Sequence, residues 1–247
     1  MGMQGWWRTS LCLVPLFLPA CVSRGTSDDS GTADRATSGP PMTAAAQTDG
    51  WRSLFDGRTT TGWRGYKSDA MPAGWSVVDG TLMKRDPVGD IITRDQFGDF
   101  ELELDWRIAR GGNAGIFYRA TEEFEHPYWT GPEYQLLDDA NARDGGNRLT
   151  SAGAAYGLYP SPAGIVKPAR EWNTARILAR GAHVEHWLND TKLLEYELWS
   201  PEWEAKLKAS KFGEWPKYGR IRSGHIAVQG DHEGELSLRN IRIRELR

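Results

Sequence analysis

The sequence of 247 residues has little cysteine, little histidine and no excess of basic charge. Its only two cysteines, Cys12 and Cys21, both lie near the N-terminus. No disulfide can therefore staple the main part of the chain, which must be held by a hydrophobic core. The formal net charge of -3 gives no reason to expect nucleic acid or an anionic membrane surface as a partner.

The N-terminal 21 residues have the pattern of an export signal. Arg8 lies in a short n-region, and the apolar stretch from Leu11 to Ala20 is too short to span a bilayer as a helix. Leu18-Pro19-Ala20-Cys21 resembles a bacterial lipobox, in which Cys21 becomes the lipidated first residue of the mature protein. We therefore expect an exported lipoprotein on the periplasmic or cell-surface side of a membrane. The alternative is an ordinary signal peptide that is cleaved near Ala20 and leaves Cys21 free.

Residues 22–49 contain almost no large apolar side chains and are rich in Ser, Thr, Gly, Ala and Asp. Such a composition cannot bury enough surface to order the chain, so a disordered tether is expected there. The composition changes abruptly at Trp51, where large apolar residues appear, and a folded domain over residues 50–247 is expected to begin.

Short strand patterns fill this domain. Residues 100–108, FELELDWRI, alternate strictly between apolar and charged side chains, which predicts a strand with one face in a core. Asp79-Gly80, between two short apolar runs, predicts a hairpin turn. One short surface helix is expected near 201–212, with Ser200 as its N-cap and Pro201 in its first position. Strand patterns at this spacing, without alternating helices, predict an all-β sandwich of two antiparallel sheets.

The chain is organised around residues 131–139, GPEYQLLDD, where a turn leads into a short strand. Alternation places Glu133, Gln135 and Leu137 on one face and Tyr134, Leu136 and Asp138 on the other. A carboxylate beside an amide can line a polar groove. The same pattern also suits an edge strand with a solvated face.

Six segments, taken together and in order, resemble the 3-keto-disaccharide hydrolase family: NAGIFYR, GPEYQLLDD, SAGAAYGLY, VKPAREWN, HVEHWLND and RNIRIREL. The resemblance runs from about Trp51 to Leu246. It implies a concanavalin A-like jelly roll and cleavage of glycosides whose sugar is oxidised at C3. Where many members have Leu-Gln-Asp-His-Gly, this chain has a segment one residue longer, Val228-Gln229-Gly230-Asp231-His232-Glu233.

The implied chemistry differs from ordinary glycoside hydrolysis, because a C3 ketone acidifies the proton on C2. A base removes that proton, the C1–O bond breaks by β-elimination, and hydration of the enone completes a net hydrolysis. The reaction needs a base with a pKa near neutrality, a donor at the ketone oxygen and an acid for the leaving oxygen.

His232 is the best candidate for the base, since histidine alone titrates near neutrality without perturbation, and Glu133 is the best carboxylate partner. Arg119 and Lys167 are candidates for polarising the ketone. The candidates for binding sugar hydroxyls are Asn113, Gln135, Asp138, Gln229 and Asp231. No cofactor is certain from these residues. A divalent cation at Glu133, Asp138 or His232 stays open, although no closely spaced ligand motif supports one.

Other residues have two interpretations each. His186 lies on the apolar phase of its strand, which favours a hydrogen-bonded core histidine over a catalytic one. Most of the tryptophans are expected in the core, and Trp129 and Trp187 are the better candidates for stacking on a sugar.

Two other functions remain open at this point. Glu101, Glu103 and Asp105 alternate on one strand face at a spacing of roughly 6–7 Å, near the separation that a direct, retaining glucanase of the laminarinase type uses. A non-catalytic carbohydrate-binding domain is the second alternative, because sandwich folds serve as lectins as readily as enzymes. Turnover of a 3-keto glycoside separates both from the expected activity.

Overall fold

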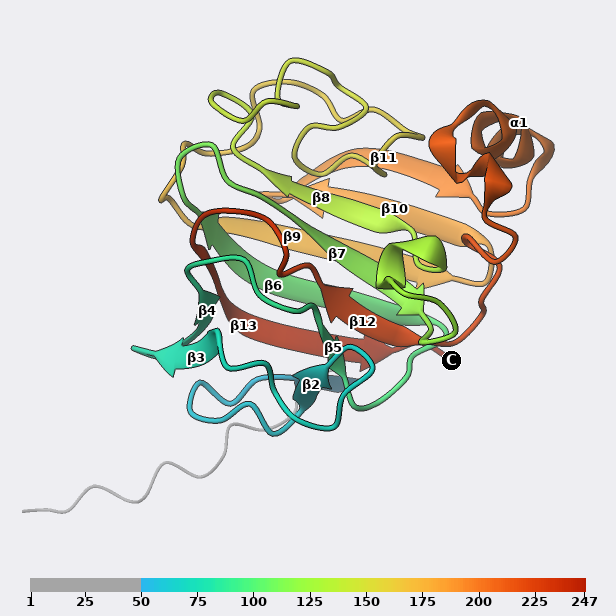
Figure 1. Cartoon of the computed structure of the whole chain (residues 1–247). Coiled ribbons are helices and arrows are strands. Elements are labelled where there is room, and N and C mark those ends of the chain that lie inside the picture. Colours follow the sequence, from blue (N-terminus) through green and yellow to red (C-terminus); the bar gives the residue numbers. More distant parts are fainter. Residues whose placement is uncertain (1–49) are drawn as a thin grey trace, which may run out of the picture. The chain divides into compact units, whose positions relative to one another are not determined.

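The computed structural model describes residues 50–247, which form two antiparallel β-sheets packed face to face (Figure 1). The expected signal peptide, Cys21 and the tether over residues 22–49 lie outside the described residues. The all-β sandwich that the strand patterns predict is confirmed.

The larger sheet has eight strands and the smaller sheet has five. In the larger sheet the order is β11-β10-β9-β6-β13-β4-β3, with β1 paired to β13, and its strands are β1 (Trp51–Ser53), β3 (Trp75–Val78), β4 (Thr81–Lys84), β6 (Phe100–Ile108), β9 (Asn173–Arg180), β10 (His183–Leu188), β11 (Thr191–Glu197) and β13 (Leu236–Glu245). In the smaller sheet the order is β2-β5-β12-β7-β8, and its strands are β2 (Trp63–Gly65), β5 (Ile91–Thr93), β7 (Asn113–Ala120), β8 (Glu133–Leu137) and β12 (His225–Val228).

The strongest sequence patterns give the elements that they predict. β6 covers the alternating segment Phe100–Ile108 from end to end. β3 and β4 form a hairpin in which Val78 lies opposite Thr81. Asp79 and Gly80 have φ angles of 48° and 74°, the left-handed conformation that a two-residue hairpin turn of type I′ requires.

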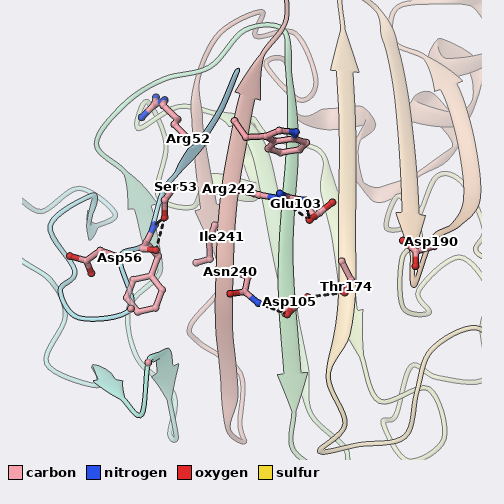
Figure 2. Close-up of a pocket in the computed structure, with 14 residues that line it drawn as sticks. Arg52, Ser53, Asp56, Glu103, Asp105, Thr174, Asp190, Asn240, Ile241 and Arg242 are labelled. Atoms are coloured by element: carbon pink, nitrogen blue, oxygen red, sulfur yellow. Dashed lines mark hydrogen bonds and ion pairs between the residues drawn. The ribbon is translucent and has the colours of Figure 1, made fainter. Parts of the chain in front are cut away.

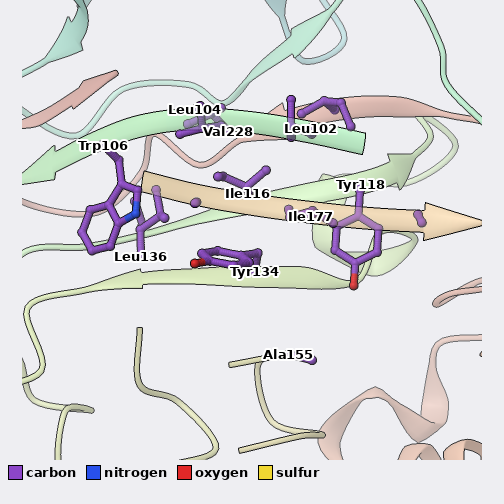
Figure 3. Packing of buried hydrophobic residues seen from close by; sticks show 14 of the residues in the cluster. Leu102, Leu104, Trp106, Ile116, Tyr118, Tyr134, Leu136, Ala155, Ile177 and Val228 are labelled. Carbon is purple, nitrogen blue, oxygen red and sulfur yellow. The ribbon is translucent and has the colours of Figure 1, made fainter. Parts of the chain in front are cut away.

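The core lies between the two sheets (Figure 3). Leu102, Leu104 and Trp106 of β6 face inward because alternate side chains of a strand share one face. From the smaller sheet, Ile116 and Tyr118 of β7 and Tyr134 and Leu136 of β8 enter the same cluster. The cross-strand pairing of β7 with β8, which sets Gly115 opposite Gln135, leaves the other face of the smaller sheet for polar side chains.

One α-helix, α1 (Pro201–Ala209), lies beside the sheets, and the Ser200 hydroxyl caps it by accepting from the Trp203 amide. The helix ends at Ala209, earlier than expected, because the Ser210 hydroxyl accepts from the Phe212 amide and starts the 3-10 helix η3 (Lys211–Glu214). A second 3-10 helix, η2 (Pro127–Trp129), precedes β8. No helix within residues 50–247 combines the length and the apolar character needed to cross a membrane.

Candidate active site

A cavity of about 380 Å³ lies over the polar face of the five-stranded sheet. Its floor is made by β7, β8 and the end of β12, and its walls by η2, η3 and the loop after β8. Strands distant in sequence therefore bring Asn113, Glu133, Gln135 and Gln229 to one place. Four of the residues selected from the sequence thus share this floor.

The amides of the floor leave acceptor atoms free for a ligand. Gln135 donates from Nε2 to Oδ1 of Asn113 at 2.8 Å, which fixes the direction of its amide. The Oε1 atoms of Gln135 and Gln229 are buried and have no hydrogen-bond partner among the described residues. Buried polar atoms are normally satisfied, so these two oxygens are suited to accept hydrogen bonds from sugar hydroxyls.

Glu133 is the ionisable group of the floor, and its side chain is almost buried, at 9% exposure. Burial raises the pKa of this carboxyl to about 8, while the Lys211 ammonium pulls the pKa the other way. The carboxyl is therefore mostly protonated at neutral pH and can donate a proton. Gly115 makes room for it, because a β-carbon at position 115 would lie 2.2 Å from Oε1 of Glu133.

Charged side chains stand at the rim. Lys211 reaches the cavity from η3, with its Nζ 4.5 Å from the ring centroid of Tyr156. Asp231 and His232 follow β12, with half-exposed side chains, and Oδ1 of Asp231 lies 3.9 Å from Nε2 of His232. Asp144 lines the cavity from the loop after β8. The cavity therefore combines a cation, a histidine and a neutral carboxyl.

One wall is aromatic. Tyr128, Trp215 and Phe212 line it, with ring centroids 5.6 Å apart for Tyr128 and Trp215 and 5.2 Å apart for Phe212 and Trp215. Trp129 is absent from the lining but stacks on Trp215, with centroids 5.7 Å apart and planes at 26°. Trp215 is therefore the indole that faces the cavity, and Trp129 supports it.

Two of the expected sugar or ketone ligands, Arg119 and Asp138, have other partners. Arg119 is 2% exposed, and its guanidinium donates to the Gly98 and Gly181 carbonyls and pairs with Asp99. The Asp138 carboxylate accepts from the Gly111 amide and from Nδ2 of Asn141, which ends β8 in a turn. These contacts correct the expectation that both side chains face the sugar.

Lys167 also lies outside the cavity lining, and its Nζ donates to the Trp172 carbonyl. The expectation that it polarises the ketone is therefore corrected too, and the ammonium that lines the cavity is that of Lys211. Tyr156 lies in the quoted segment SAGAAYGLY, but nothing in the sequence places its side chain at the cavity. No sequence pattern marks Lys211 or Trp215, because they reach the cavity only through packing of the helical segment.

His186 and Trp187 belong to the eight-stranded sheet. His186 is fully buried, with Nδ1 3.0 Å from the Gly153 carbonyl and Nε2 3.1 Å from the Tyr118 hydroxyl. Burial lowers its pKa to about 4, so it is a neutral core histidine, as its strand phase favours. Trp187 lies under the Arg176 guanidinium, 4.0 Å from the ring centroid, and is absent from the cavity lining.

A larger hollow of about 770 Å³ lies on the outer face of the eight-stranded sheet (Figure 2). The two carboxylates that β6 contributes to it are paired with arginines: Glu103 pairs with Arg242 at 2.5 Å, and Asp105 pairs with Arg239 at 3.2 Å and accepts from the Thr174 hydroxyl. Glu101 is held by Arg176 and Arg244. The alternating carboxylates of β6 are therefore structural, which argues against the glucanase arrangement.

One group among residues 50–247 has the spacing of metal ligands, His183, Glu185 and Glu195 on β10 and β11. The Lys192 ammonium lies 3.6 Å from Glu185 and 2.7 Å from Glu195, so both carboxylates already share a cation. The group is also separate from the lining of the cavity.

Comparisons with known proteins agree with this fold. A sequence profile described as the 3-keto-alpha-glucoside-1,2-lyase-like domain matches residues 50–244. A 3-keto-disaccharide hydrolase from Bacteroides thetaiotaomicron is 36% identical over 230 residues, which cover 80% of this chain and 79% of the relative.

Two crystal structures of candidate glycosyl hydrolases from Parabacteroides distasonis have a similar fold. One has a TM-score of 0.75 and 32% identity, covering 80% of this chain and 94% of the other. The second has a TM-score of 0.62 and 28% identity, covering 79% of this chain and 99% of the other.

Proposed function

The chain belongs to the 3-keto-alpha-glucoside-1,2-lyase-like family, and on that premise we propose that it cleaves 3-keto glycosides in the cavity of its five-stranded sheet. The observation that carries the proposal is Glu133, a carboxyl that burial keeps protonated beside free acceptor oxygens and a lysine. A polar cavity of this kind, with a strongly shifted pKa at its floor, is characteristic of an acid–base site.

The ketone of the substrate determines what the protein must supply. His232 takes the proton from C2 onto a ring nitrogen, and the electron pair of the C2–H bond forms an enolate with its charge on the ketone oxygen. The Lys211 ammonium stabilises that oxygen, as preorganised cations do for developing negative charge. These roles use two groups at the rim of the cavity.

Collapse of the enolate then breaks the C1–O bond, and the leaving oxygen takes the proton of Glu133. Addition of water to the resulting enone gives the 3-keto sugar, so that the net reaction is a hydrolysis. The free Oε1 atoms of Gln135 and Gln229 accept from sugar hydroxyls and hold the ring. The aromatic wall of Tyr128 and Trp215 offers a flat surface to a sugar face or to the leaving group.

The test is turnover of matched substrates. We expect the protein to cleave a 3-keto glucoside and to leave the corresponding unoxidised glucoside and β-glucan intact, because only the ketone makes the C2 proton acidic. Cleavage of both substrates at similar rates would contradict the mechanism. Binding of the 3-keto glucoside without turnover would instead make the domain a carbohydrate-binding module.

We also propose that the protein is exported and that Cys21 carries a lipid anchor, an inference that rests on the lipobox-like Leu18-Pro19-Ala20-Cys21. Cys21→Ser is expected to move the protein from the membrane fraction to the soluble fraction without changing turnover of a soluble substrate. A wild-type protein that is soluble, with an unmodified N-terminus beyond Cys21, would contradict this proposal.

A further inference from the structure

The segment that carries Gln229, Asp231 and His232 into the cavity continues β12 past its last paired residue, Val228. Its first residue is still tied to the sheet, because the Gln229 amide donates to the Gly115 carbonyl at 2.9 Å. Beyond it the chain leaves the ladder and the side chains of Asp231 and His232 are half-exposed. What holds this backbone lies behind the segment, outside the cavity lining.

Asp90, just before β5, makes the first of two contacts. Its side chain is 9% exposed, and Oδ1 accepts from the Gly230 amide at 2.8 Å. Gly230 is closely fitted on the other side, since a β-carbon there would lie 2.6 Å from the Val88 carbonyl oxygen and 2.7 Å from that of Gly89. The Gly230 carbonyl in turn accepts from the Val88 amide at 3.0 Å.

Lys84, the last residue of β4, makes the second contact. It shares a strand face with the core residue Leu82 and is 1% exposed, an unusual position for a lysine. Its ammonium donates to the backbone carbonyl of His232. Burial lowers the pKa of this ammonium, and the carboxylates of Asp231, Glu233, Asp86 and Asp90 act in the opposite direction.

Both charged groups are costly to bury, and neither serves the rest of the scaffold. Within residues 50–247, the only hydrogen bond of each side chain goes to the backbone of this one segment. An apolar residue would fill either position without the cost of desolvating a charge. The contacts therefore point to a requirement for the backbone at Gly230 and His232 to lie in one place.

We propose that Asp90 and Lys84 are positioning residues that clamp the segment 229–233 from behind and so fix His232 over the cavity. The clamp combines a buried anion on the Gly230 amide with a buried cation on the His232 carbonyl. The inference rests on the proposed function, in which His232 is the base. A base that is displaced by about 1 Å loses roughly a hundredfold in rate, so the clamp is a requirement of the reaction.

The variants separate contact from charge. Asp90→Ala and Lys84→Met each remove one contact, and we expect kcat/KM on a 3-keto glucoside to fall roughly ten- to hundredfold, mostly through kcat. Asp90→Asn keeps an acceptor oxygen for the Gly230 amide and is expected to retain activity within about threefold of wild type. An Asp90→Asn variant as impaired as Asp90→Ala would overturn the clamp in favour of a purely electrostatic effect.

Asp86→Asn is the matched control for Lys84. Asp86 is exposed and is one of the carboxylates near the Lys84 ammonium, but its side chain makes no hydrogen bond within the described residues. Its loss is expected to leave kcat/KM within about twofold of wild type, as is usual for a surface charge. If Asp86→Asn lowers kcat/KM as much as Lys84→Met does, the rate depends on the local charge and not on the contact of Lys84 with the His232 carbonyl, and the clamp is overturned.

A double-mutant cycle distinguishes positioning from general damage to the fold. In a His232→Ala background, the further change Asp90→Ala is expected to cost less than about threefold, because the group that it positions is already gone. Full additivity of the two losses would show that Asp90 acts by another route and would overturn the proposal.

Hydrogen exchange tests the same clamp without relying on activity. Amides of residues 229–233 are expected to exchange faster in Asp90→Ala and Lys84→Met than in the wild type, while those of β6 and β13 stay protected. Unchanged exchange at 229–233 would overturn the clamp. Two results together would refute the proposed function and leave the clamp standing. The wild type would turn over no 3-keto glucoside, and both variants would still exchange the amides of residues 229–233 faster than the wild type does.

Discussion

Two nearly buried glutamates on the two sheets have opposite surroundings. Glu101 of the eight-stranded sheet is 4% exposed and is held between Arg176, at 2.8 Å, and Arg244. Glu133 of the five-stranded sheet is 9% exposed, and its carboxyl makes no hydrogen bond or ion pair within residues 50–247. The first carboxylate is neutralised by its neighbours, whereas the second stays neutral by keeping its proton.

This difference shows how burial alone fails to identify a catalytic carboxyl. The charged face of β6 has the more conspicuous sequence pattern and the larger hollow, but its arginines leave no carboxylate free for chemistry. The less conspicuous Glu133 has a cavity, a shifted pKa and no arginine. Pairing, more than exposure, separates these two carboxyls, and we propose the unpaired one as the functional group.

The largest expected effect concerns activity. Glu133→Gln is expected to lower kcat/KM on a 3-keto glucoside by roughly a hundredfold or more, the usual size of one acid–base contribution. Glu101→Gln, the matched control on the other sheet, is expected to stay within about twofold. Comparable losses in the two variants, measured at one pH with folding checked by circular dichroism, would remove the distinction between the sheets.

The pH profile is the next largest effect. Glu133 must hold a proton to protonate the leaving oxygen, so kcat/KM should fall about tenfold for each pH unit above its pKa of about 8. Lys211→Met is expected to move this alkaline limb to higher pH, because the ammonium holds the pKa of Glu133 down. The measurement is a profile from pH 6 to 10, and a wild-type rate that is constant across this range would exclude Glu133 as the acid.

Substitution of the two glutamates should change thermal stability in opposite directions. The pKa of Glu133 is about 8 in the folded protein and 4.5 ordinarily, so between these values the unfolded chain releases a proton that the folded chain keeps. Wild-type stability therefore falls as the pH rises through this window. Glu133→Gln should raise Tm most above pH 8 and little near pH 4. The rise should be roughly 2–4 °C for each kcal/mol by which the substitution increases the free energy of unfolding.

Glu101→Gln is expected to act in the other direction, because it leaves Arg176 and Arg244 without their shared partner. Both arginines are about one-third exposed, so we expect a loss of about 1–3 kcal/mol rather than the larger figure for a fully buried pair. Calorimetry at pH 7 gives the comparison. A lower Tm for Glu133→Gln than for Glu101→Gln would contradict the expected difference between the two glutamates.

The smallest expected effect belongs to the more exposed neighbour on the same strand. Glu103 pairs with Arg242, whose side chain is 48% exposed, and such surface pairs contribute about 0–1 kcal/mol. Glu103→Gln should therefore shift Tm by no more than about 3 °C and leave activity unchanged. A larger loss would mean that the arginines of β13 act as one network with Glu101.

Period-two alternation was enough to predict β6 and the phase of β8, which puts Glu133 and Gln135 on one face, and the turn signal Asp79-Gly80 was enough to predict the β3–β4 hairpin. The same rule fails at Arg119, which lies in phase with Asn113 and Gly115 on β7. Arg119 has a φ of 53°, and the pairing with β12 shifts register there, so its side chain leaves the cavity face. A local break in alternation has no signature in one sequence.

Lys211 illustrates the other limit of prediction. Its position depends on where α1 ends and on how η3 packs against Tyr156 and the floor of the cavity, and both are set by tertiary contacts. The family resemblance indicated the chemistry and the order of the motifs, but the cation was expected at Arg119 or Lys167. Sequence patterns locate strand faces well, and they locate a side chain on an irregular segment poorly.

The position of β13 has a consequence for how the domain forms. This last strand of the fold lies in the middle of the eight-stranded sheet, between β6 and β4, and also pairs with β1. Its partners precede it by more than a hundred residues, so their pairing requires closure of long loops, which slows folding. Until residues 236–245 have left the ribosome, the eight-stranded sheet is divided in two, and the nascent chain remains a substrate for chaperones.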